Sequence, residues 1–420
     1  MKGTLTKRAL LTGNKAAAWG ARLANVDYVP AFPITPQTEI IETIGNWIDN
    51  GEMDCRMVTL ESEHSMLTAA GAAAVTGVRV FSATSSQGLL YAMEMLYTVA
   101  GWRAPFVLVN VSRGLSAPIT LEPDHNDILA ARDCGFLQIH CSTCQEVLDS
   151  TLIAYRLAEN ERVRLPIIVN MDGFYLSFTR EPVEIADAEA VREFIGAFDP
   201  EKISFRASTP ISHAVAVLGG IPYSYFRYET HLAVLNALAV YDEITKEFGN
   251  VFGRRHEVVE DYRTEDAELV FVMMGSFATK AKDAVDQLRA TGWRIGLLRP
   301  RLLRPFPAGF FHRALAGKQG VAVIDQNLSM GMGGVLHTEL ASALHRQTAV
   351  SPVLVSFIGG LGGRDIGIEE FYQMAAVTRK AVENGEVPPP RLLYTKGELR
   401  EVKKLQAVAH AERQELAREQ

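Results

Sequence analysis

Short apolar runs alternate with amphipathic stretches of helical length between residues 14 and 174 of the chain. Each amphipathic stretch is long enough to form a helix that crosses back over a sheet. Strands that alternate with helices are typical of a parallel, doubly wound sheet, so we predict an α/β fold for this part. The predicted strands are Tyr28–Ala31, Met57–Leu60, Arg79–Ser82, Pro105–Val111, Phe136–His140 and Leu165–Met171.

The alternation lapses after Glu181 and resumes near residue 269. The intervening part contains an irregular segment to about Pro210, a helical pattern over Glu229–Gly249 that we expect to pack on the first domain, and a charged stretch over Arg254–Asp266. We place a domain boundary in that charged stretch, which gives domains at residues 1–262 and 263–395 and a charged helical tail at 396–420. The strands predicted for the second, smaller α/β domain are Leu269–Met274, Ile295–Leu298, Val321–Ile324 and Val353–Phe357.

Polar side chains follow several predicted strands of the first domain at the point where each strand ends. They are Thr35, Glu63, Ser85 with Gln87, and Arg113. Because the carboxyl ends of parallel strands share one edge of a sheet, we expect these side chains to meet where such folds bind ligands. Taken singly, Thr35 is explained as the N-cap of a helix that begins at Pro36, and Glu63 as a carboxylate at a helix start capped by Ser62.

Composition and charge narrow the class of protein. The chain is 48% hydrophobic and 22% charged, so it can bury substantial cores. Its net charge of −7 argues against binding to nucleic acid or to an anionic membrane surface. No apolar run is long enough for a transmembrane helix and no signal-peptide pattern is present, so we expect a cytoplasmic protein without a membrane partner.

The cysteines are interpreted as structural. The chain has 4 cysteines, too few for a disulfide framework, which suits a reducing compartment. Cys141-x-x-Cys144 has no second pair to complete a four-ligand metal site. Thr143 and Glu146 overlap it with the spacing of a capping box, which predicts a helix start there.

Two loops keep more than one interpretation. Asp124-His125 fits a metal pair or an acid–base pair, but without further ligands nearby a hydrogen-bond cluster within the loop is favoured. Gly359–Gly363 fits an anion-binding loop or a tight turn after a strand equally well. Gly331-Met332-Gly333-Gly334 lacks the spacing and strand context of a dinucleotide-binding loop, so we reject that function for it.

The motifs of the first domain, taken in order, resemble the alpha subunit of the 2-oxoacid:ferredoxin oxidoreductases, the thiamine-diphosphate family that includes pyruvate:ferredoxin oxidoreductase. The second domain is similar at the level of pattern, including Gly275-Ser276 after its first strand. The stretches that carry the resemblance are Phe32-Pro33-Ile34-Thr35-Pro36-Gln37-Thr38, Glu61-Ser62-Glu63-His64, Ala83-Thr84-Ser85-Ser86-Gln87-Gly88, Leu115-Ser116-Ala117-Pro118-Ile119, Asp124-His125-Asn126-Asp127, Ala130-Ala131-Arg132-Asp133 and Val169-Asn170-Met171-Asp172-Gly173-Phe174.

The resemblance implies a pyrimidine-type thiamine domain followed by a transketolase C-terminal-like domain. The family's activating glutamate maps onto Glu63, which would hydrogen-bond the aminopyrimidine ring and hold its imino tautomer. Its substrate contacts map onto Thr35 and Arg113, whose guanidinium matches the carboxylate of a 2-oxoacid. The neighbouring cofactor-binding residues implied are Pro33, Ser85 and Gln87.

Two absences define the partners that the resemblance implies. The chain has no Gly-Asp-Gly motif with a downstream Asn for Mg²⁺ and diphosphate, and no C-x-x-C-x-x-C run for an iron–sulfur cluster. In the family these lie on other chains. We therefore expect a hetero-oligomer with a beta subunit that holds the diphosphate and Mg²⁺, a gamma subunit, a ferredoxin-like subunit with [4Fe-4S] clusters and, where NAD is the final acceptor, a flavin subunit. Coenzyme A is the expected co-substrate.

The substrate loop departs from the pyruvate-type pattern. It reads Thr120-Leu121-Glu122-Pro123, where pyruvate-type members carry a bulky aromatic and small residues, so Leu121 is a candidate substrate contact. The substrate is expected to be pyruvate or an aryl 2-oxoacid such as phenylglyoxylate. Two other hypotheses stay open: a non-catalytic scaffold subunit of an electron-transfer complex, and a non-redox thiamine-dependent lyase or transferase.

Overall fold

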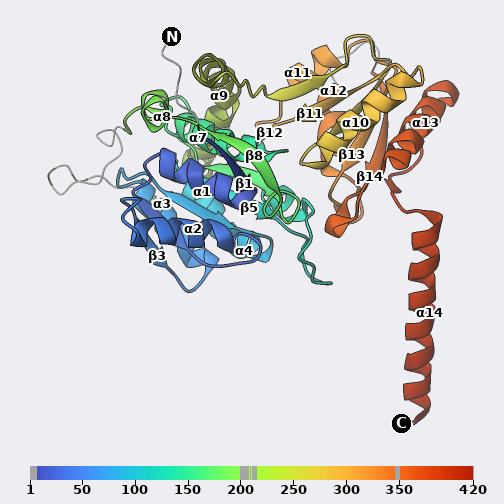
Figure 1. Cartoon of the computed structure of the whole chain (residues 1–420), viewed down its shortest axis with the longest axis horizontal. Coiled ribbons are helices and arrows are strands. Elements are labelled where there is room, and N and C mark those ends of the chain that lie inside the picture. Colours follow the sequence, from blue (N-terminus) through green and yellow to red (C-terminus); the bar gives the residue numbers. More distant parts are fainter. Residues whose placement is uncertain (1–6, 199–207, 209, 211–214, 346–350, 420) are drawn as a thin grey trace.

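The computed structural model describes residues 7–198, 208, 210, 215–345 and 351–419 of the chain (Figure 1). Two α/β units lie side by side, and a long C-terminal helix projects away from the second unit (Figure 1). None of the helices in these described ranges is long and apolar enough to cross a membrane. The predicted fold class, a doubly wound parallel sheet followed by a second α/β unit, is confirmed.

The first unit is built on one sheet with the order β12-β6-β7-β5-β4, which a parallel bridge between Tyr28 and Val80 extends to β2 and β3. Its strands are β2 (Tyr28–Ala31), β3 (Arg56–Thr59), β4 (Phe81–Thr84), β5 (Val107–Ser112), β6 (Leu137–His140), β7 (Ile167–Asp172) and the antiparallel β12 (Leu302–Arg304). Helices cover both faces, so β5 and β7 are buried along their whole length.

The helices of the first unit up to residue 158 follow the predicted alternation, whereas the helix Ala188–Ile195 lies in the segment that was predicted to be irregular. The helices of this unit are α1 (Gly13–Leu23), α2 (Thr38–Asp49), α3 (Glu63–Ala74), α4 (Gln87–Tyr91), α5 (Met93–Gly101), α6 (Asn126–Ala130), α7 (Cys144–Ala158), α8 (Ala188–Ile195) and α9 (Gly220–Phe252). A separate antiparallel ribbon joins β1 (Lys7–Thr12) to β8 (Arg180–Ile185). The hydrophobic pattern did not predict this ribbon, because each of its strands is half-exposed and finds its partner more than 160 residues away.

The second unit has a six-stranded sheet with the order β15-β14-β13-β10-β11-β9. Its strands are β9 (Val259–Tyr262), β10 (Leu269–Met273), β11 (Ile295–Pro300), β13 (Gly320–Asp325), β14 (Val353–Ile358) and β15 (Arg391–Leu392). Its helices are α10 (Phe277–Ala290), α11 (Ala308–Ala314), α12 (Val335–Leu344), the short turn η2 (Leu361–Gly363), α13 (Ile368–Asn384) and α14 (Lys396–Glu419). The charged stretch around residue 260 thus holds an edge strand, β9, paired antiparallel with β11.

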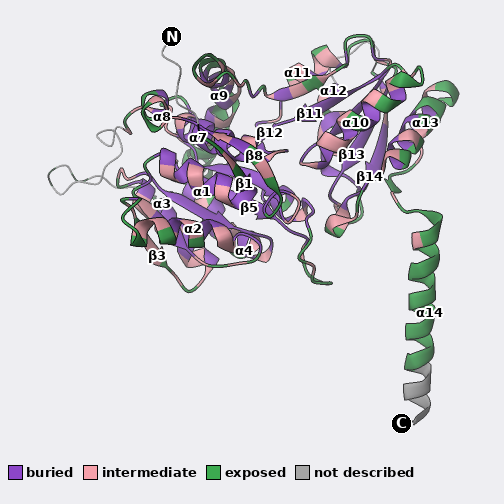
Figure 2. Cartoon of the chain, viewed as in Figure 1, coloured by how far each residue is buried: buried purple, intermediate pink, exposed green. Residues whose placement is uncertain are grey.

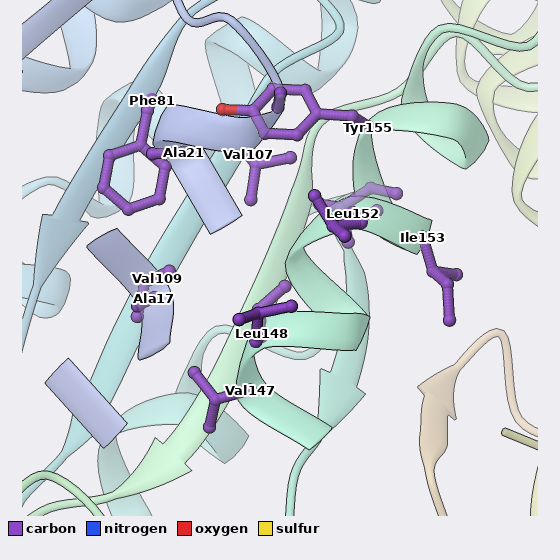
Figure 3. Packing of buried hydrophobic residues seen from close by; sticks show 14 of the residues in the cluster. Ala17, Ala21, Phe81, Val107, Val109, Val147, Leu148, Leu152, Ile153 and Tyr155 are labelled. Atoms are coloured by element: carbon purple, nitrogen blue, oxygen red, sulfur yellow. The ribbon is translucent and has the colours of Figure 1, made fainter. Parts of the chain in front are cut away.

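The core of the first unit lies between the sheet and the helix pair α1 and α7 (Figure 3). Small residues on α1, including Ala17 and Ala21, let it approach Leu148 and Leu152 of α7 closely, and all four are fully buried. Gly20 has no room for a side chain, because a Cβ there would lie 2.6 Å from Thr151. Each buried leucine contributes roughly 1.5–3 kcal/mol by leaving water.

The helical pattern over Glu229–Gly249 is confirmed as part of the longer helix α9, which packs on the first unit. Its buried face combines Ala233 and Ala237, whose small side chains let α9 lie close to α7, with the larger Val240 and Tyr241. Ile211–Gly220, singled out as apolar, begins among residues outside the described ranges.

The start of α7 confirms half of the predicted capping box. The Thr143 side chain accepts a hydrogen bond from the Glu146 amide at 3.2 Å. The Glu146 carboxylate does not bond back to Thr143 but accepts from Ser142 N at 2.8 Å. Cys141 and Cys144 are buried thiols, and burial raises the pKa of Cys141 to about 12; this burial favours the structural interpretation of the pair, which stays a prediction.

The tail forms the predicted helix, α14, whose residues 399–413 are exposed to solvent (Figure 2). Its first turn is held by Arg364, which donates to both oxygens of Glu398 at 2.8 and 2.7 Å. Gly359–Gly363 adopts a tight turn after β14, with positive φ at Gly360, Gly362 and Gly363. The Gly363 amide donates to Pro123 O at 2.8 Å, so this turn meets the predicted substrate loop of the first unit.

Candidate functional site

Three loops at the carboxyl edge of the first sheet converge on one side chain, Arg113, which directly follows β5. Its Nη1 donates to the backbone oxygen of Thr35, after β2, at 2.8 Å. Its Nη2 donates to Oε1 of Gln87, at the start of α4, also at 2.8 Å. Since β2, β4 and β5 run parallel, their ends share this edge, and the structure brings Thr35, Gln87 and Arg113 together.

The Arg113 guanidinium is buried and only partly satisfied. It is 7% exposed, and among the described residues its Nε has no hydrogen-bond partner. Its two recorded acceptors are neutral, a carbonyl and an amide oxygen. Burial lowers the pKa of Arg113, although the Asp127 carboxylate opposes the shift. A buried cation of this kind suits an anionic ligand, and a carboxylate matches its geometry through paired hydrogen bonds.

Glu63 is the first residue of α3, and the helix begins there because Ser62 caps it: the Ser62 side chain accepts from Ser65 N at 3.2 Å. The Glu63 carboxylate is 5% exposed. Burial raises the pKa of Glu63, and a hydrogen bond from its own backbone offsets only part of that shift. The group therefore holds a proton more readily than a glutamate in water, as a proton-sharing partner for a ligand should.

Gly88 connects Glu63 to the Arg113 cluster. A Cβ built at Gly88 would overlap the Glu63 carboxylate and would lie 2.7 Å from Thr84 Oγ1. Gly88 directly follows Gln87 on α4. Glu63 lies against Gly88 and Arg113 bonds Gln87, so the two ionisable groups of the site meet adjacent residues. In the described part of the chain, the hydroxyls of Thr84 and Ser85 are buried without a hydrogen-bond partner. The site thus combines a buried carboxyl group, a buried guanidinium and two buried hydroxyls that have no partner in the described part of the chain.

Replacing Gly88 with Ala is expected to lower kcat by up to about 100-fold, because the new methyl group displaces the Glu63 carboxylate by a fraction of an ångström or more. The measurement is steady-state turnover of the purified complex. Gly101→Ala is the matched control, since a Cβ at Gly101 meets no atom within 4 Å. Equal rates in both variants would contradict the close approach at Gly88.

The structure corrects the prediction that Thr35 caps α2. The helix begins at Thr38, and the residue at its N-cap position is Gln37. Gln37 Nε2 donates to Phe32 O at 2.8 Å, and Asn14 Nδ2 donates to Pro36 O at 2.9 Å. These bonds hold the segment in a turn ahead of the helix, so Thr35 offers its backbone oxygen to Arg113 instead of capping.

The remaining predicted site residues fall into two groups. Ser85 is fully buried in the loop between β4 and α4. Pro33 and Leu121 lie at the surface, Leu121 with 47% exposure, and neither shares a described hydrogen bond with Arg113 or Gln87. Gly114 N donates to Glu122 O at 3.0 Å, so the loop that carries Leu121 returns to the rim beside Arg113.

Sequence reasoning missed Ser116, whose Oγ accepts from Gln87 Nε2 at 2.9 Å and extends the Arg113 cluster by one loop. The signal was present in the Leu115-Ser116-Ala117-Pro118-Ile119 stretch, to which no role had been given. A serine hydroxyl in an irregular loop has no periodicity that marks it, so only the fold reveals the contact.

A second cluster joins the two units beside this edge. His125 Nε2 lies 2.7 Å from Asp172 Oδ1, and Asp172 Oδ2 accepts from Ser276 N at 2.8 Å. Burial opposes a charge on His125, but Asp172 outweighs it and raises the pKa of His125. The favoured hydrogen-bond cluster within the loop is seen only at Asp124, whose Oδ1 accepts from Asn126 N at 3.0 Å, whereas His125 bonds outside its own loop. The role of Asp172 and Ser276 as the link between the units was not predicted.

Comparison with known proteins places these features in one family. Residues 19–247 match the family model described as pyruvate flavodoxin/ferredoxin oxidoreductase, thiamine diP-bdg. Residues 267–371 match pyruvate:ferredoxin oxidoreductase core domain II. The two matches cover the two α/β units in the order in which the chain presents them.

Curated relatives are similar over nearly their whole length. Pyruvate synthase subunit PorA of Pyrococcus abyssi is 40% identical over 383 residues, which is 91% of this chain and 96% of that protein. The PorA subunit of Thermotoga maritima is also 40% identical, over 90% of this chain and 95% of that protein. Ketoisovalerate oxidoreductase subunit VorA of Pyrococcus horikoshii is 40% identical over 90% and 96%.

Solved structures agree on the fold. A 2-oxoglutarate:ferredoxin oxidoreductase from Magnetococcus marinus superposes with a TM-score of 0.67 and 19% identity, over 89% of this chain; this chain spans 65% of that one. A split-gene transketolase superposes with a TM-score of 0.53 and 12% identity, over 89% of this chain and 99% of that one. At these identities the superpositions show a shared fold.

Proposed function

This chain belongs to the pyruvate flavodoxin/ferredoxin oxidoreductase family, as an alpha subunit of a multi-subunit 2-oxoacid oxidoreductase. We propose that it binds the 2-oxoacid and half of the thiamine cofactor, and that the complex decarboxylates the 2-oxoacid oxidatively to an acyl-CoA. The buried, partly satisfied guanidinium of Arg113 carries this proposal. A 2-oxoacid carboxylate would satisfy it, since a planar fork of N–H donors pairs well with two carboxylate oxygens.

The residues present fit thiamine diphosphate. Glu63 offers a buried carboxyl with a raised pKa, and Thr84 and Ser85 offer hydroxyls that lack partners in the described structure. Together they match the polar edge of an aminopyrimidine ring. When bound, thiamine diphosphate supplies a carbon nucleophile for the keto carbon and a sink for the electron pair released with carbon dioxide. Glu63 would hold a proton at a ring nitrogen, and Pro33 would form the adjoining wall.

Substrate orientation falls to the Arg113 cluster. Arg113 would hold the carboxylate, with its fork kept in place by Thr35 O and Gln87 Oε1. The Thr35 hydroxyl, on an exposed residue, would contact the same substrate, and Leu121 would line the side-chain end of the pocket. The named relatives act on pyruvate or ketoisovalerate, and the similarity to the pyruvate synthase subunits favours pyruvate here. Phenylglyoxylate is the aryl alternative.

The remaining chemistry needs other chains. We propose a beta subunit for the diphosphate and Mg²⁺, a gamma subunit, and a ferredoxin-like subunit whose [4Fe-4S] clusters accept the two electrons, with a flavin subunit where NAD is the final acceptor. Coenzyme A would take the acyl group. Such an assembly is a cytoplasmic hetero-oligomer, which agrees with the chain's lack of both diphosphate and cluster motifs.

The test is to purify the native complex through a tag on this chain and to assay coenzyme-A-dependent dye reduction without oxygen. Pyruvate, 2-oxoglutarate, ketoisovalerate and phenylglyoxylate are compared side by side, and bound thiamine diphosphate and iron are quantified. Turnover of pyruvate is expected. Turnover of only one of the other acids would overturn the pyruvate assignment, and a complex without thiamine diphosphate would overturn the function as a whole.

Arg113→Lys is expected to raise the KM for the 2-oxoacid by about 10- to 100-fold, because one ammonium replaces a fork and a charge-assisted hydrogen bond is worth roughly 1.5–3 kcal/mol. The KM for coenzyme A should change little. Arg162→Lys, at an exposed pair with Glu243, is the control. An unchanged 2-oxoacid KM would remove Arg113 from the substrate site.

A further inference from the structure

A single buried carboxylate, Asp127 in the first turn of α6, lies beneath the loops that form the candidate site. Asp127 is 0% exposed. It belongs to the Asp124-His125-Asn126-Asp127 stretch, yet it neither faces His125 in a hydrogen bond nor pairs with a described cation. A buried carboxylate without a counter-ion is costly unless many hydrogen bonds compensate it.

Five donors surround this carboxylate, and they come from three different segments. Oδ1 accepts from Ser112 Oγ at 2.6 Å and from Ile128 N at 2.7 Å. Oδ2 accepts from Ser86 N at 3.0 Å, from Asn110 Nδ2 at 3.1 Å and from Arg113 N at 3.3 Å. Every one of these contacts uses the carboxylate as acceptor, so no neutral side chain of the same shape can replace all five.

Two of the five donors are the backbone amides that set the geometry of the site. Ser86 N directly precedes Gln87, and Ser86 adopts a left-handed conformation with φ of 51°, which a fixed hydrogen bond helps to maintain. Arg113 N belongs to the residue whose guanidinium bonds Gln87. Asp127 therefore holds two backbone positions with one carboxylate: that of Ser86, which precedes Gln87, and that of Arg113. Gln87 and Arg113 are the two partners of one hydrogen bond.

The strands beneath are tied to the same point. Asn110, in β5, donates from Nδ2 both to Asp127 and to Asn170 Oδ1 of β7, the latter at 2.8 Å. Ser86 Oγ donates to Gly114 O at 3.1 Å, a second bond between the β4 loop and the β5 loop. Strands β5 and β7 and the Asp127 carboxylate therefore fix the distance between the loop after β4 and the loop after β5. Binding sites are more precise when rigid elements support their loops.

We propose that Asp127 is a positioning residue for the 2-oxoacid: it holds the Arg113 fork and Gln87 at the separation that receives the substrate carboxylate. The inference rests on the proposed function and adds to it a residue that touches neither substrate nor cofactor. Asp127 affects the substrate only through Arg113. Its substitution should therefore matter when Arg113 is present and have little effect when Arg113 has been replaced.

The test uses Asp127→Asn in the purified complex. The amide places an N–H group against at least two of the five donors, so the Ser86 and Arg113 backbones shift. The KM for the 2-oxoacid is expected to rise at least about tenfold, with a smaller change in kcat at saturation and none in the KM for coenzyme A. In an Arg113→Lys background, Asp127→Asn should add at most about twofold to KM, because the fork that it positions is already gone.

Asp149→Asn is the matched control. Asp149 is equally buried, at 0% exposure, but it holds Arg254 and His256 instead of the site loops. The Asp149→Asn variant should have a lower thermal stability than wild type and an unchanged KM for the 2-oxoacid. If Asp127→Asn does not assemble, Ser112→Ala carries the test, since it removes one of the five donors and should raise the same KM in the same selective way.

The outcomes separate the two levels of the proposal. A 2-oxoacid KM that is unchanged in Asp127→Asn, or a rise of equal size with and without Arg113, would make Asp127 a purely structural residue and leave the proposed function standing. A wild-type complex that contains its cofactors and turns over none of the four 2-oxoacids would overturn the proposed function, and this inference would fall with it.

Discussion

Glu63→Gln is expected to reduce kcat of the complex by about 10²–10⁴-fold, the range attributed to a positioned proton-transfer group. Glutamine keeps the size of the side chain, so the close approach of this side chain to Gly88 stays in place. It cannot exchange a proton with a ring nitrogen, which is the task that burial and the raised pKa of Glu63 suit it for. The complex should assemble normally and bind its cofactor more weakly. Turnover and bound thiamine diphosphate are measured on the same preparation.

The control for this variant is Glu61→Gln, two residues earlier in the chain. Glu61 is exposed and accepts a hydrogen bond from Ser65 Oγ at 2.5 Å, so it shares the helix start without sharing the site. Its substitution should leave kcat within about twofold of wild type, as is usual for surface changes. Near-normal turnover in Glu63→Gln would remove Glu63 from the catalytic step, whatever the result for Glu61.

The second large effect concerns stability. Glu146→Ala is expected to lower the free energy of unfolding by about 3–5 kcal/mol, because it leaves the buried Arg301 guanidinium without its carboxylate partner and removes one of the two carboxylates that pair with Arg299. Glu146 Oε1 accepts from Arg299 Nη2 at 2.5 Å and from Arg301 Nη2 at 2.8 Å. These arginines are 1% and 3% exposed. Arg299 lies in β11 and Arg301 lies between β11 and β12, whereas Glu146 lies in α7. These ion pairs therefore connect the second unit to the first.

Urea unfolding of the purified complex, followed by circular dichroism, measures this loss. Glu243→Ala, which breaks the exposed pair with Arg162, is the control and should have a much smaller effect. Burial alone raises the pKa of Glu146, but Arg299 and Arg301 outweigh it and hold the pKa well below its ordinary value. The stabilisation is therefore present above the unfolded-state pKa and is lost as the pH falls through the folded-state pKa. A variant that matches the control at neutral pH, or that keeps the wild-type acid sensitivity, would contradict this account.

Local pattern was sufficient for much of this molecule. The parallel strands, most helix starts and the second α/β unit follow from hydrophobic periodicity and capping, because these depend on neighbours within a few residues. The order of the strand-end motifs identified the family, and the candidate site residues Glu63, Gln87 and Arg113 were named from it. Their presence at one sheet edge follows from the general behaviour of parallel sheets, which is why a sequence can predict it.

Contacts between distant segments were decided by the tertiary structure. The periodicity gave no sign that β12 would pair with β6, or that Glu146 would meet arginines about 150 residues further on. Thr35 was predicted as a helix cap, and only the folded turn showed that Arg113 takes its backbone oxygen. Asp127 has no local signature at all, since its five donors converge from three segments. Local pattern and motif order were enough to predict the kind of chemistry and the sheet edge that presents it. The fold decided the separations on which that chemistry depends, because long-range packing sets them and local preference does not.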